Sequence, residues 1–204
     1  MAKGGKLITV EGVDGAGKST HLAFLADCIR GRGHRVLTTR EPGGTPLAEA
    51  LRELLMKEPM DGVAEALLMF AARADHVARV IEPALAGGNW VLCDRFTDAT
   101  LAYQGAGKGV QEAFLVALAK QAHPALRPDL TLLFDCPYDI SRQRLERTGK
   151  VLDRFEREDQ AFFERVRDRY LKLAKEEPAR WRVIDASKGL AEIKKSVKEA
   201  VSSV

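Results

Sequence analysis

The chain has 204 residues, of which 46% are hydrophobic and 30% are charged, and its formal net charge is +3. This size fits one compact domain, residues 1–204. Acidic and basic residues are interleaved, so the chain lacks the strong basic excess that duplex-binding proteins need. No apolar run reaches 18 residues, which excludes a membrane-spanning helix. Because the N-terminus does not resemble a signal peptide either, we expect a cytoplasmic protein without nucleic-acid or membrane partners.

Cysteine usage agrees with a reducing compartment. Cys28, Cys93 and Cys136 are odd in number, far apart and flanked by apolar residues. This pattern favours buried free thiols over disulfides or a metal site.

Regular elements alternate along the chain. Five apolar runs rich in β-branched residues predict strands, at residues 6–11, 35–39, 90–94, 130–135 and 181–185. Segments with helical periodicity lie between and after them, at residues 18–30, 63–86, 110–122, 138–147, 157–176 and 190–201. This alternation predicts an α/β fold, a doubly wound, five-stranded parallel sheet with helices on both faces, because parallel neighbours require crossovers.

A glycine-rich segment, GVDGAGKST, follows the first predicted strand and matches the P-loop pattern GxxxxGK[ST]. Such a loop points backbone N–H groups at phosphate oxygens, while Lys18 would reach the β and γ phosphates and Ser19 would offer its hydroxyl to Mg²⁺. The alternative is an ordinary capped turn between a strand and a helix. We predict an ATP site formed by Gly12, Val13, Asp14, Gly15, Ala16, Gly17, Lys18, Ser19 and Thr20.

Other features decide between the classes of P-loop protein. A GTPase switch would be expected to carry an Asn-Lys-x-Asp tetrapeptide, and the sequence has none. Asp14 lies inside the loop, where bound triphosphate would repel its carboxylate unless a sugar hydroxyl or a metal ion were its partner. We interpret Asp14 as a substrate contact, and the alternative is an exposed turn residue.

Cations are needed wherever two polyanions meet, because one unit-charge pair 4 Å apart costs about 4 kcal/mol at an effective dielectric near 20. Asp94 and Arg95 end the third predicted strand, at the edge of the sheet where ligands of open α/β folds bind. We assign Asp94 to Mg²⁺ and Arg95 to an acceptor phosphate, the alternative being a surface ion pair. Arg73 lies on a largely apolar helix, which favours contact with a ligand or a buried acid over a solvated helix edge.

A basic segment at residues 140–157 is predicted to form a hinged lid. Thr148 and Gly149 break it between two helices. Lid closure would exclude water and bring an arginine to the transferring phosphoryl group, and Arg147 is our first choice. The alternative is a solvated helix held by salt bridges. The cations of the segment are Arg142, Arg144, Arg147, Lys150, Arg154 and Arg157.

Three further motifs are REPGGT (40–45), MFAAR (69–73) and DRFTDATLAYQG (94–105). Together with the P-loop, and in the same order along nearly the whole chain, they resemble the bacterial thymidylate kinases, which are P-loop nucleoside monophosphate kinases. The resemblance implies a fold of the P-loop NTPase type and a homodimer. It also implies Mg²⁺-dependent transfer of the ATP γ-phosphoryl group to dTMP, giving ADP and dTDP for dTTP synthesis.

The resemblance also implies roles for individual residues. Asp14 would lie near the sugar 3′-hydroxyl, Arg73 would read thymine and Arg95 would hold the monophosphate. Tyr103 would crowd a 2′-hydroxyl, which would favour deoxyribose. The substrate site expected on this basis is Asp14, Pro42, Phe70, Arg73, Arg95, Thr100, Tyr103 and Gln104. The catalytic residues are expected to be Lys18, Arg95 and Arg147, and the Mg²⁺ ligands Ser19 and Asp94.

The sequence departs from the family pattern at two places. Met69 stands where many members have the aromatic residue that stacks on thymine, with Phe70 next to it. Ala99, followed by Thr100, stands where members often have serine. Gly15 replaces a P-loop arginine of the eukaryotic type, so the lid should supply the catalytic charge.

The rival functions are a deoxynucleoside kinase, which would phosphorylate an uncharged 5′-hydroxyl, a nucleotide-dependent switch, and RNA binding by the basic lid.

Overall fold

The computed structural model describes residues 4–149 and 151–204 and contains a five-stranded parallel sheet in the order β2-β3-β1-β4-β5. The strands agree with the predicted ones to within one residue at each end, which confirms the α/β prediction. They are β1 (Leu7–Glu11), β2 (Val36–Arg40), β3 (Trp90–Asp94), β4 (Leu130–Asp135) and β5 (Trp181–Asp185).

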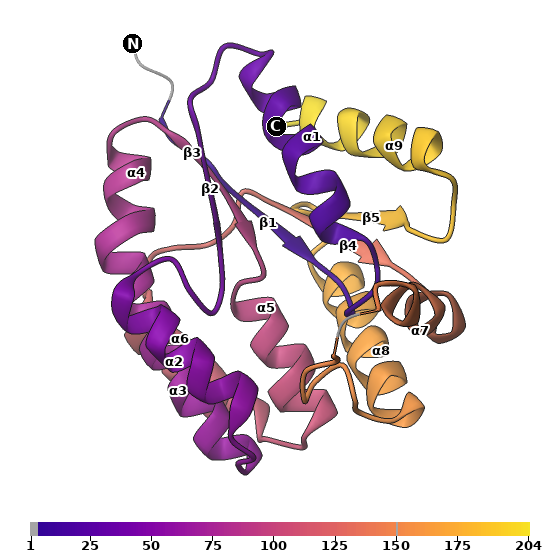
Figure 1. Ribbon diagram of the computed structural model, residues 1–204. Helices are drawn as coiled ribbons and strands as arrows, with labels where there is room; N and C mark the ends of the chain where they lie inside the picture. The colour runs from indigo at the N-terminus through magenta and orange to yellow at the C-terminus, as the bar shows by residue number, and fades with distance from the viewer. Residues whose placement is uncertain (1–3, 150) are drawn as a thin grey trace.

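Helices lie on both faces of this sheet. Figure 1 shows α1 and α9 together on one side, with α4, α5 and α8 on the other. Two π-helical stretches, Val77–Ile81 and Leu101–Gly107, continue α3 and α5. The α-helices are α1 (Lys18–Arg30), α2 (Pro46–Lys57), α3 (Gly62–His76), α4 (Glu82–Ala86), α5 (Thr97–Thr100), α6 (Glu112–Ala122), α7 (Tyr138–Arg147), α8 (Gln160–Glu176) and α9 (Leu190–Ser202).

Two helical regions were not among the predicted ones, namely α2 and the continuous helix that α5 forms with the 101–107 segment. α2 begins at Pro46, where proline suits the first helical position, and Thr45 caps it by accepting a hydrogen bond from the Ala48 amide at 3.1 Å. Residues 101–107 were not predicted to be helical, because glycines such as those of this segment usually mark breaks between regular elements. A Cβ added at Gly107 would lie 2.5 Å from the Phe162 ring, so this glycine allows close packing against α8.

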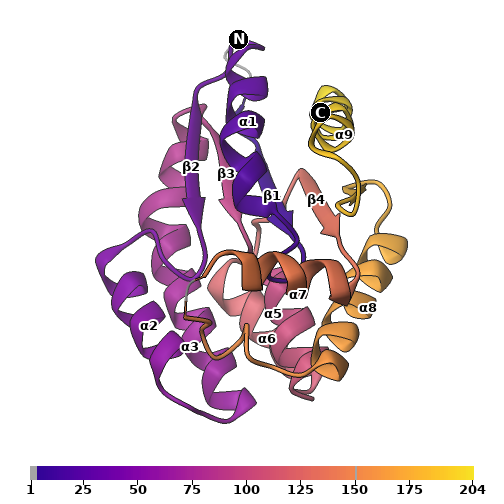
Figure 2. The same cartoon turned by 45° about the vertical axis from the view of Figure 1, so that its right-hand side comes forward.

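The strand order reverses at β1, which pairs with β3 on one side and with β4 on the other. Such a reversal opens a crevice at the carboxyl ends of the strands, where open α/β sheets bind their ligands. Figure 2 shows α7 lying beside these strand ends. β1 is buried throughout, so a rigid core supports the loops that leave this edge.

Two further sequence-based expectations concern the state of the cysteines and the presence of membrane-spanning helices. All three cysteines are free thiols, with Cys93 and Cys136 buried and Cys28 partly exposed. Across residues 4–149 and 151–204, no helix is both long and apolar enough to cross a membrane.

Candidate active site

The P-loop forms one wall of a polar cleft at the end of β1. Positive φ angles at Gly15 (79°) and Gly17 (91°) curl the backbone, and a Cβ at Gly15 would lie 2.3 Å from the Ser141 carbonyl oxygen. The buried Lys18 ammonium donates to the carbonyl oxygens of Gly12 and Val13 at 2.9 and 3.0 Å. The loop residues that line the cleft are Asp14, Gly15, Gly17, Lys18, Ser19 and Thr20. Gly12, Val13 and Ala16 are buried behind them.

A cluster of polar groups joins this P-loop cleft to a second cleft. Arg95 Nη2 donates to Asp14 Oδ1 at 2.6 Å and to the Tyr103 hydroxyl at 2.9 Å, and that hydroxyl donates to Asp14 Oδ2 at 2.9 Å. Burial opposes ionisation of Asp14, but the charges of Arg95 and Lys18 and the two hydrogen bonds outweigh it and lower the pKa of Asp14 to about 2. Asp14 is therefore a carboxylate at neutral pH.

Arg95 itself has an unusual backbone conformation, with φ at 69°. Non-glycine residues rarely adopt positive φ, and such strain is often found at functional sites. The Arg95 amide donates to the Val10 carbonyl oxygen at 2.9 Å, so the end of β3 is fixed to β1 while the side chain turns toward the P-loop.

Arg73 occupies the far end of the second cleft and is only 2% exposed. Its Nε donates to Glu41 Oε2 at 2.6 Å, and its Nη2 donates to the Phe96 carbonyl and the Thr100 hydroxyl, both at 3.1 Å. Within the part of the chain that the structure describes, Arg73 Nη1 is buried without a hydrogen-bond partner. Because a buried donor without an acceptor is costly, this N–H is suited to a ligand.

The second cleft, called the acceptor cleft below, contains all but one of the predicted substrate residues. Its lining is Asp14, Glu41, Pro42, Arg52, Met56, Met69, Arg73, Arg95, Phe96, Ala99, Thr100, Tyr103, Gln104, Asp153 and Phe155.

Phe70 requires a correction. It is 4% exposed and packs in a core cluster with Ala66, Val110 and Leu115, whereas its neighbour Met69 lines the acceptor cleft. Successive helical residues point about 100° apart, so the two side chains cannot face the same cleft. The helix directs Met69 toward the acceptor cleft and Phe70 into the core.

Several residues of the acceptor cleft were not identified from the sequence. Glu41 lies next to Pro42 in the REPGGT motif, so that motif could have indicated it. Arg52 and Met56 lie on α2, which was not predicted. Asp153 and Phe155 lie in the second half of the basic segment, in a loop after α7 without regular periodicity, and we did not identify them as cleft residues from the sequence.

The basic segment 140–157 extends over the P-loop cleft only in part. Arg144 lines that cleft, and its Nη1 lies 3.4 Å from the Ala16 carbonyl oxygen. Arg147 is exposed and lines neither cleft as far as residues 4–149 and 151–204 define them. Arg142 pairs with Glu146 at 3.1 Å, as expected for a solvated helix. Lys150 lies outside the described residues, and a catalytic role for Arg147 remains a prediction.

The residues suited to a metal ion lie in the P-loop cleft. Asp94 Oδ1 is buried and has no hydrogen-bond partner among the described residues, and Asp94 lines this cleft together with Ser19. Carboxylate and hydroxyl oxygens are the ligand types that Mg²⁺ prefers. A second group, Glu41, His76 and Cys93, is compact, but Glu41 is already paired with both Arg73 and His76. The P-loop cleft is therefore the better metal site.

A P-loop at the switch point of a parallel sheet, adjoining a cleft lined by the buried Arg73 and the partly exposed Arg95, defines a P-loop kinase of the nucleoside monophosphate kinase class. The family model for thymidylate kinase matches residues 10–197. The chain belongs to the thymidylate kinase family.

Relatives from several bacteria agree with this assignment. A thymidylate kinase of Bordetella pertussis is 54% identical over 206 residues, covering 99% of each chain. One of Cupriavidus metallidurans is 53% identical over 200 residues, covering 98% of this chain and 99% of the relative. The crystal structure of thymidylate kinase from Ehrlichia chaffeensis has a TM-score of 0.77 and 34% identity, with 97% of this chain and 99% of that one covered.

Proposed function

We propose that this chain transfers the γ-phosphoryl group of ATP to dTMP, giving ADP and dTDP for dTTP synthesis. The observation that carries the proposal is the continuity of the two clefts. Both are lined by Asp14, Glu41, Arg52, Arg95 and Asp153. A donor phosphate on the P-loop would therefore meet an acceptor phosphate at Arg95.

The chemical contribution of the chain is positioning and charge neutralisation, because an oxygen of the acceptor phosphate is itself the nucleophile. Lys18 holds its ammonium at the P-loop through two carbonyl oxygens and would exchange them for β and γ phosphate oxygens. The Arg95 guanidinium would neutralise the acceptor phosphate, and its fork of N–H donors matches phosphate oxygens.

Base and sugar recognition would fall to the far end of the acceptor cleft. The unpaired Nη1 of Arg73 is suited to a carbonyl oxygen of thymine, and Met69 can cover a ring face with its flexible thioether. Tyr103, fixed by hydrogen bonds to Asp14 and Arg95, would crowd a 2′-hydroxyl. Pro42, Thr100 and Gln104 complete the proposed contacts.

Mg²⁺ is the proposed cofactor, and Ser19 and Asp94 are the residues that would hold it. When bound, it would neutralise phosphate charge. The orphaned Oδ1 of Asp94 supports this assignment, since a buried carboxylate oxygen without a partner is costly unless a cation or donor meets it.

We further propose that residues 1–204 act as a single kinase domain with 140–157 as its lid. Arg144 already contacts the P-loop, and closure of α7 would bring Arg147 toward the transferring phosphoryl group. An arginine supplied in this way contributes about 10³ to 10⁵ in rate in comparable enzymes.

A homodimer through α2, α3 and α6 is also proposed. These helices contact one another, α2 with α3 and α3 with α6. They carry large apolar side chains that are exposed, namely Leu47, Leu54, Val63, Leu67 and Val116. Several exposed apolar side chains on helices that contact one another favour a protein partner. Because dTMP and ATP are cytoplasmic metabolites, we place the enzyme in the cytoplasm.

The proposal is tested by ADP release from ATP and Mg²⁺ with dTMP, dUMP, UMP, CMP, AMP and thymidine as acceptors. Strong preference for dTMP supports the proposed acceptor. Preference for thymidine would indicate a nucleoside kinase, and turnover that needs no acceptor would indicate a switch or simple ATPase.

A further inference from the structure

A buried carboxylate lies behind the acceptor cleft. Glu65, in the first turn of α3, is 0% exposed and does not line the cleft as defined by the described residues. Two hydrogen-bond donors and one further cation converge on it. Gln104 Nε2 donates to Oε1 at 2.6 Å, Lys108 Nζ donates to Oε2 at 3.2 Å, and Arg154 Nη2 pairs with Oε2 at 2.5 Å. A fully buried carboxylate is tolerated because it is paired in this way.

These three groups come from two segments that are far apart in the sequence and that both contribute residues to the acceptor cleft. Gln104 lies in the 101–107 segment and lines the cleft, and Lys108 follows this segment. Arg154 lies in the loop between α7 and α8, 89 positions after Glu65 in the sequence. One carboxylate therefore connects residues 151–157, the second half of the proposed lid segment, to the helix that carries Arg73.

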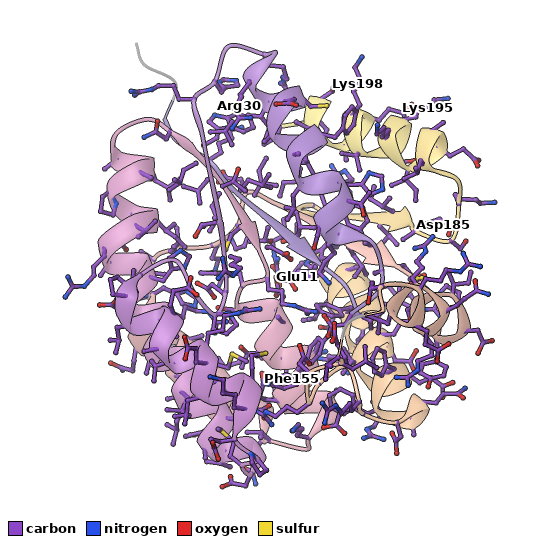
Figure 3. The ribbon with its side chains drawn as sticks, viewed as in Figure 1. Glu11, Arg30, Phe155, Asp185, Lys195 and Lys198 are labelled. Atoms are coloured by element: carbon purple, nitrogen blue, oxygen red, sulfur yellow. The ribbon has the colours of Figure 1, made fainter. Side chains whose placement is uncertain are left out.

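Arg154 in turn holds an aromatic side chain against the cleft. Its guanidinium lies 4.3 Å from the centroid of the Phe155 ring, and its Nε donates to the Leu55 carbonyl oxygen of α2. Phe155 packs edge-on against Tyr103, with ring centroids 6.1 Å apart. Figure 3 shows Phe155 below the end of β1, where Glu11 is labelled. Phe155 and its neighbour Asp153 both line the acceptor cleft.

Local hydrogen bonds fix the shape of this loop but not its place. Asp153 Oδ1 accepts from the amides of Phe155 and Glu156 at 2.9 and 3.0 Å, which closes a turn within the loop itself. The ion pair of Arg154 with Glu65 is what attaches this turn to α3. Loss of the pair would leave the turn formed but weaken its attachment, which would then rest on the burial of Phe155 and on the contact of Arg154 with α2.

We propose that Glu65 is a positioning residue of the acceptor site. Through Arg154 it fixes the cleft residues Asp153 and Phe155, and through its hydrogen bond with Gln104 it fixes a further lining residue. The proposal rests on the proposed function, because the ligand whose binding depends on these residues is the nucleoside monophosphate.

Steady-state kinetics of Glu65→Gln test the role. The amide keeps the volume of the side chain but removes the charge that holds Arg154, so the KM for dTMP should rise about tenfold while the KM for ATP changes by less than about twofold. Glu53→Gln is the matched control, since Glu53 lies on α2 with its side chain 73% exposed. It should leave both constants unchanged. Equal rises in both KM values with Glu65→Gln would overturn the proposal.

Arg154→Met keeps the test decisive if Glu65→Gln does not fold. In this variant Glu65 retains Lys108 and Gln104, so α3 keeps its partners and Tm should stay close to that of the parent protein. The same selective rise in the KM for dTMP is expected. Wild-type kinetics with dTMP would contradict the proposal.

Hydrogen exchange of the nucleotide-free enzyme gives a readout that needs no acceptor. Peptides covering 151–157 should exchange faster in Glu65→Gln and in Arg154→Met than in the parent or in Glu53→Gln, while peptides of β1 remain protected. Unchanged exchange in the loop would overturn the positioning role. If the parent enzyme did not phosphorylate dTMP, the proposed function would fail. The exchange experiment would still show whether Glu65 holds residues 151–157 in place, because it needs no activity.

Discussion

Asp14 and Arg95 form an ion pair with atoms 2.6 Å apart, although they belong to different motifs, the P-loop and the end of β3. The pair is accessible at the junction of the two clefts, and Tyr103 bonds to both members. An acceptor phosphate bound to Arg95 would therefore lie next to the Asp14 carboxylate. The repulsion between them is tolerable if a sugar hydroxyl donates a hydrogen bond to Asp14. In the proposed function, the pair would link recognition of the phosphate to recognition of the sugar.

Arg95→Ala should weaken dTMP binding by about 10²-fold or more, because a charge-assisted, forked contact to the acceptor phosphate is removed. ATP binding should persist, since Lys18 and the P-loop backbone stay in place. Calorimetric titration with each nucleotide alone measures both effects. Arg30→Ala, an exposed arginine on α1 paired with Asp27, is the control. Equal loss of both ligands would contradict the role of Arg95.

Met69→Ala and Phe70→Ala should separate ligand contact from core packing. Met69→Ala should raise the KM for dTMP severalfold with little change in Tm, because Met69 lines the acceptor cleft. Phe70→Ala should cost about 3–5 kcal/mol of unfolding free energy, as for a buried aromatic residue. Kinetics and denaturant unfolding of both variants give the answer. A purely kinetic effect of Phe70→Ala would return that ring to the ligand.

Glu11 should give the protein a pH-dependent stability. Burial, with the charge of Asp98, raises the pKa of Glu11 to about 8 against the opposing effects of Arg95, Tyr170 and Phe96. The folded state therefore binds a proton that the unfolded state releases, so this contribution is complete below pH about 4.5 and is lost as pH rises toward 8.

Denaturant unfolding between pH 5 and 8 tests this assignment. The unfolding free energy should fall by up to about 1.4 kcal/mol per pH unit from this group, and Glu11→Gln should remove the slope because the amide does not titrate. An identical slope in the variant would show that Glu11 is ionised in the fold.

The two lid arginines should have different kinetic signatures. Arg147→Ala should lower kcat by about 10³ with little effect on the KM for ATP, if lid closure brings Arg147 to the phosphoryl group. Arg144→Ala should mainly raise the KM for ATP, because Arg144 already lies at the P-loop. Single-turnover rates for both variants decide between them, and the reverse pattern would transfer the catalytic role to Arg144.

Much of the fold was predictable because each strand is a short run of β-branched and apolar residues bounded by turn residues. The positions of Lys18, Asp14 and Arg95 in the cleft were predictable for a related reason. They lie at a strand end or in a glycine-rich loop, and both features can be read from the sequence. Orientation on a helix was less predictable. Met69 and Phe70 are both apolar, and only the packing of α3 decides which of them faces the ligand.

Long-range contacts were beyond prediction for a different reason. Nothing in the sequence around Glu65 distinguishes it from a surface glutamate, and its burial depends on Arg154 from a loop without periodicity. Phe155 enters the acceptor cleft only because this loop is held there. Such contacts depend on the tertiary fold and have no local pattern.

The most direct test of the account is transfer of label from [γ-³²P]ATP to dTMP under single-turnover conditions with Mg²⁺. The account predicts that the label appears in dTDP at the rate at which ADP forms, and that Arg95→Ala abolishes this transfer while ATP remains bound. Label released as inorganic phosphate, or transferred equally well to thymidine, would contradict it.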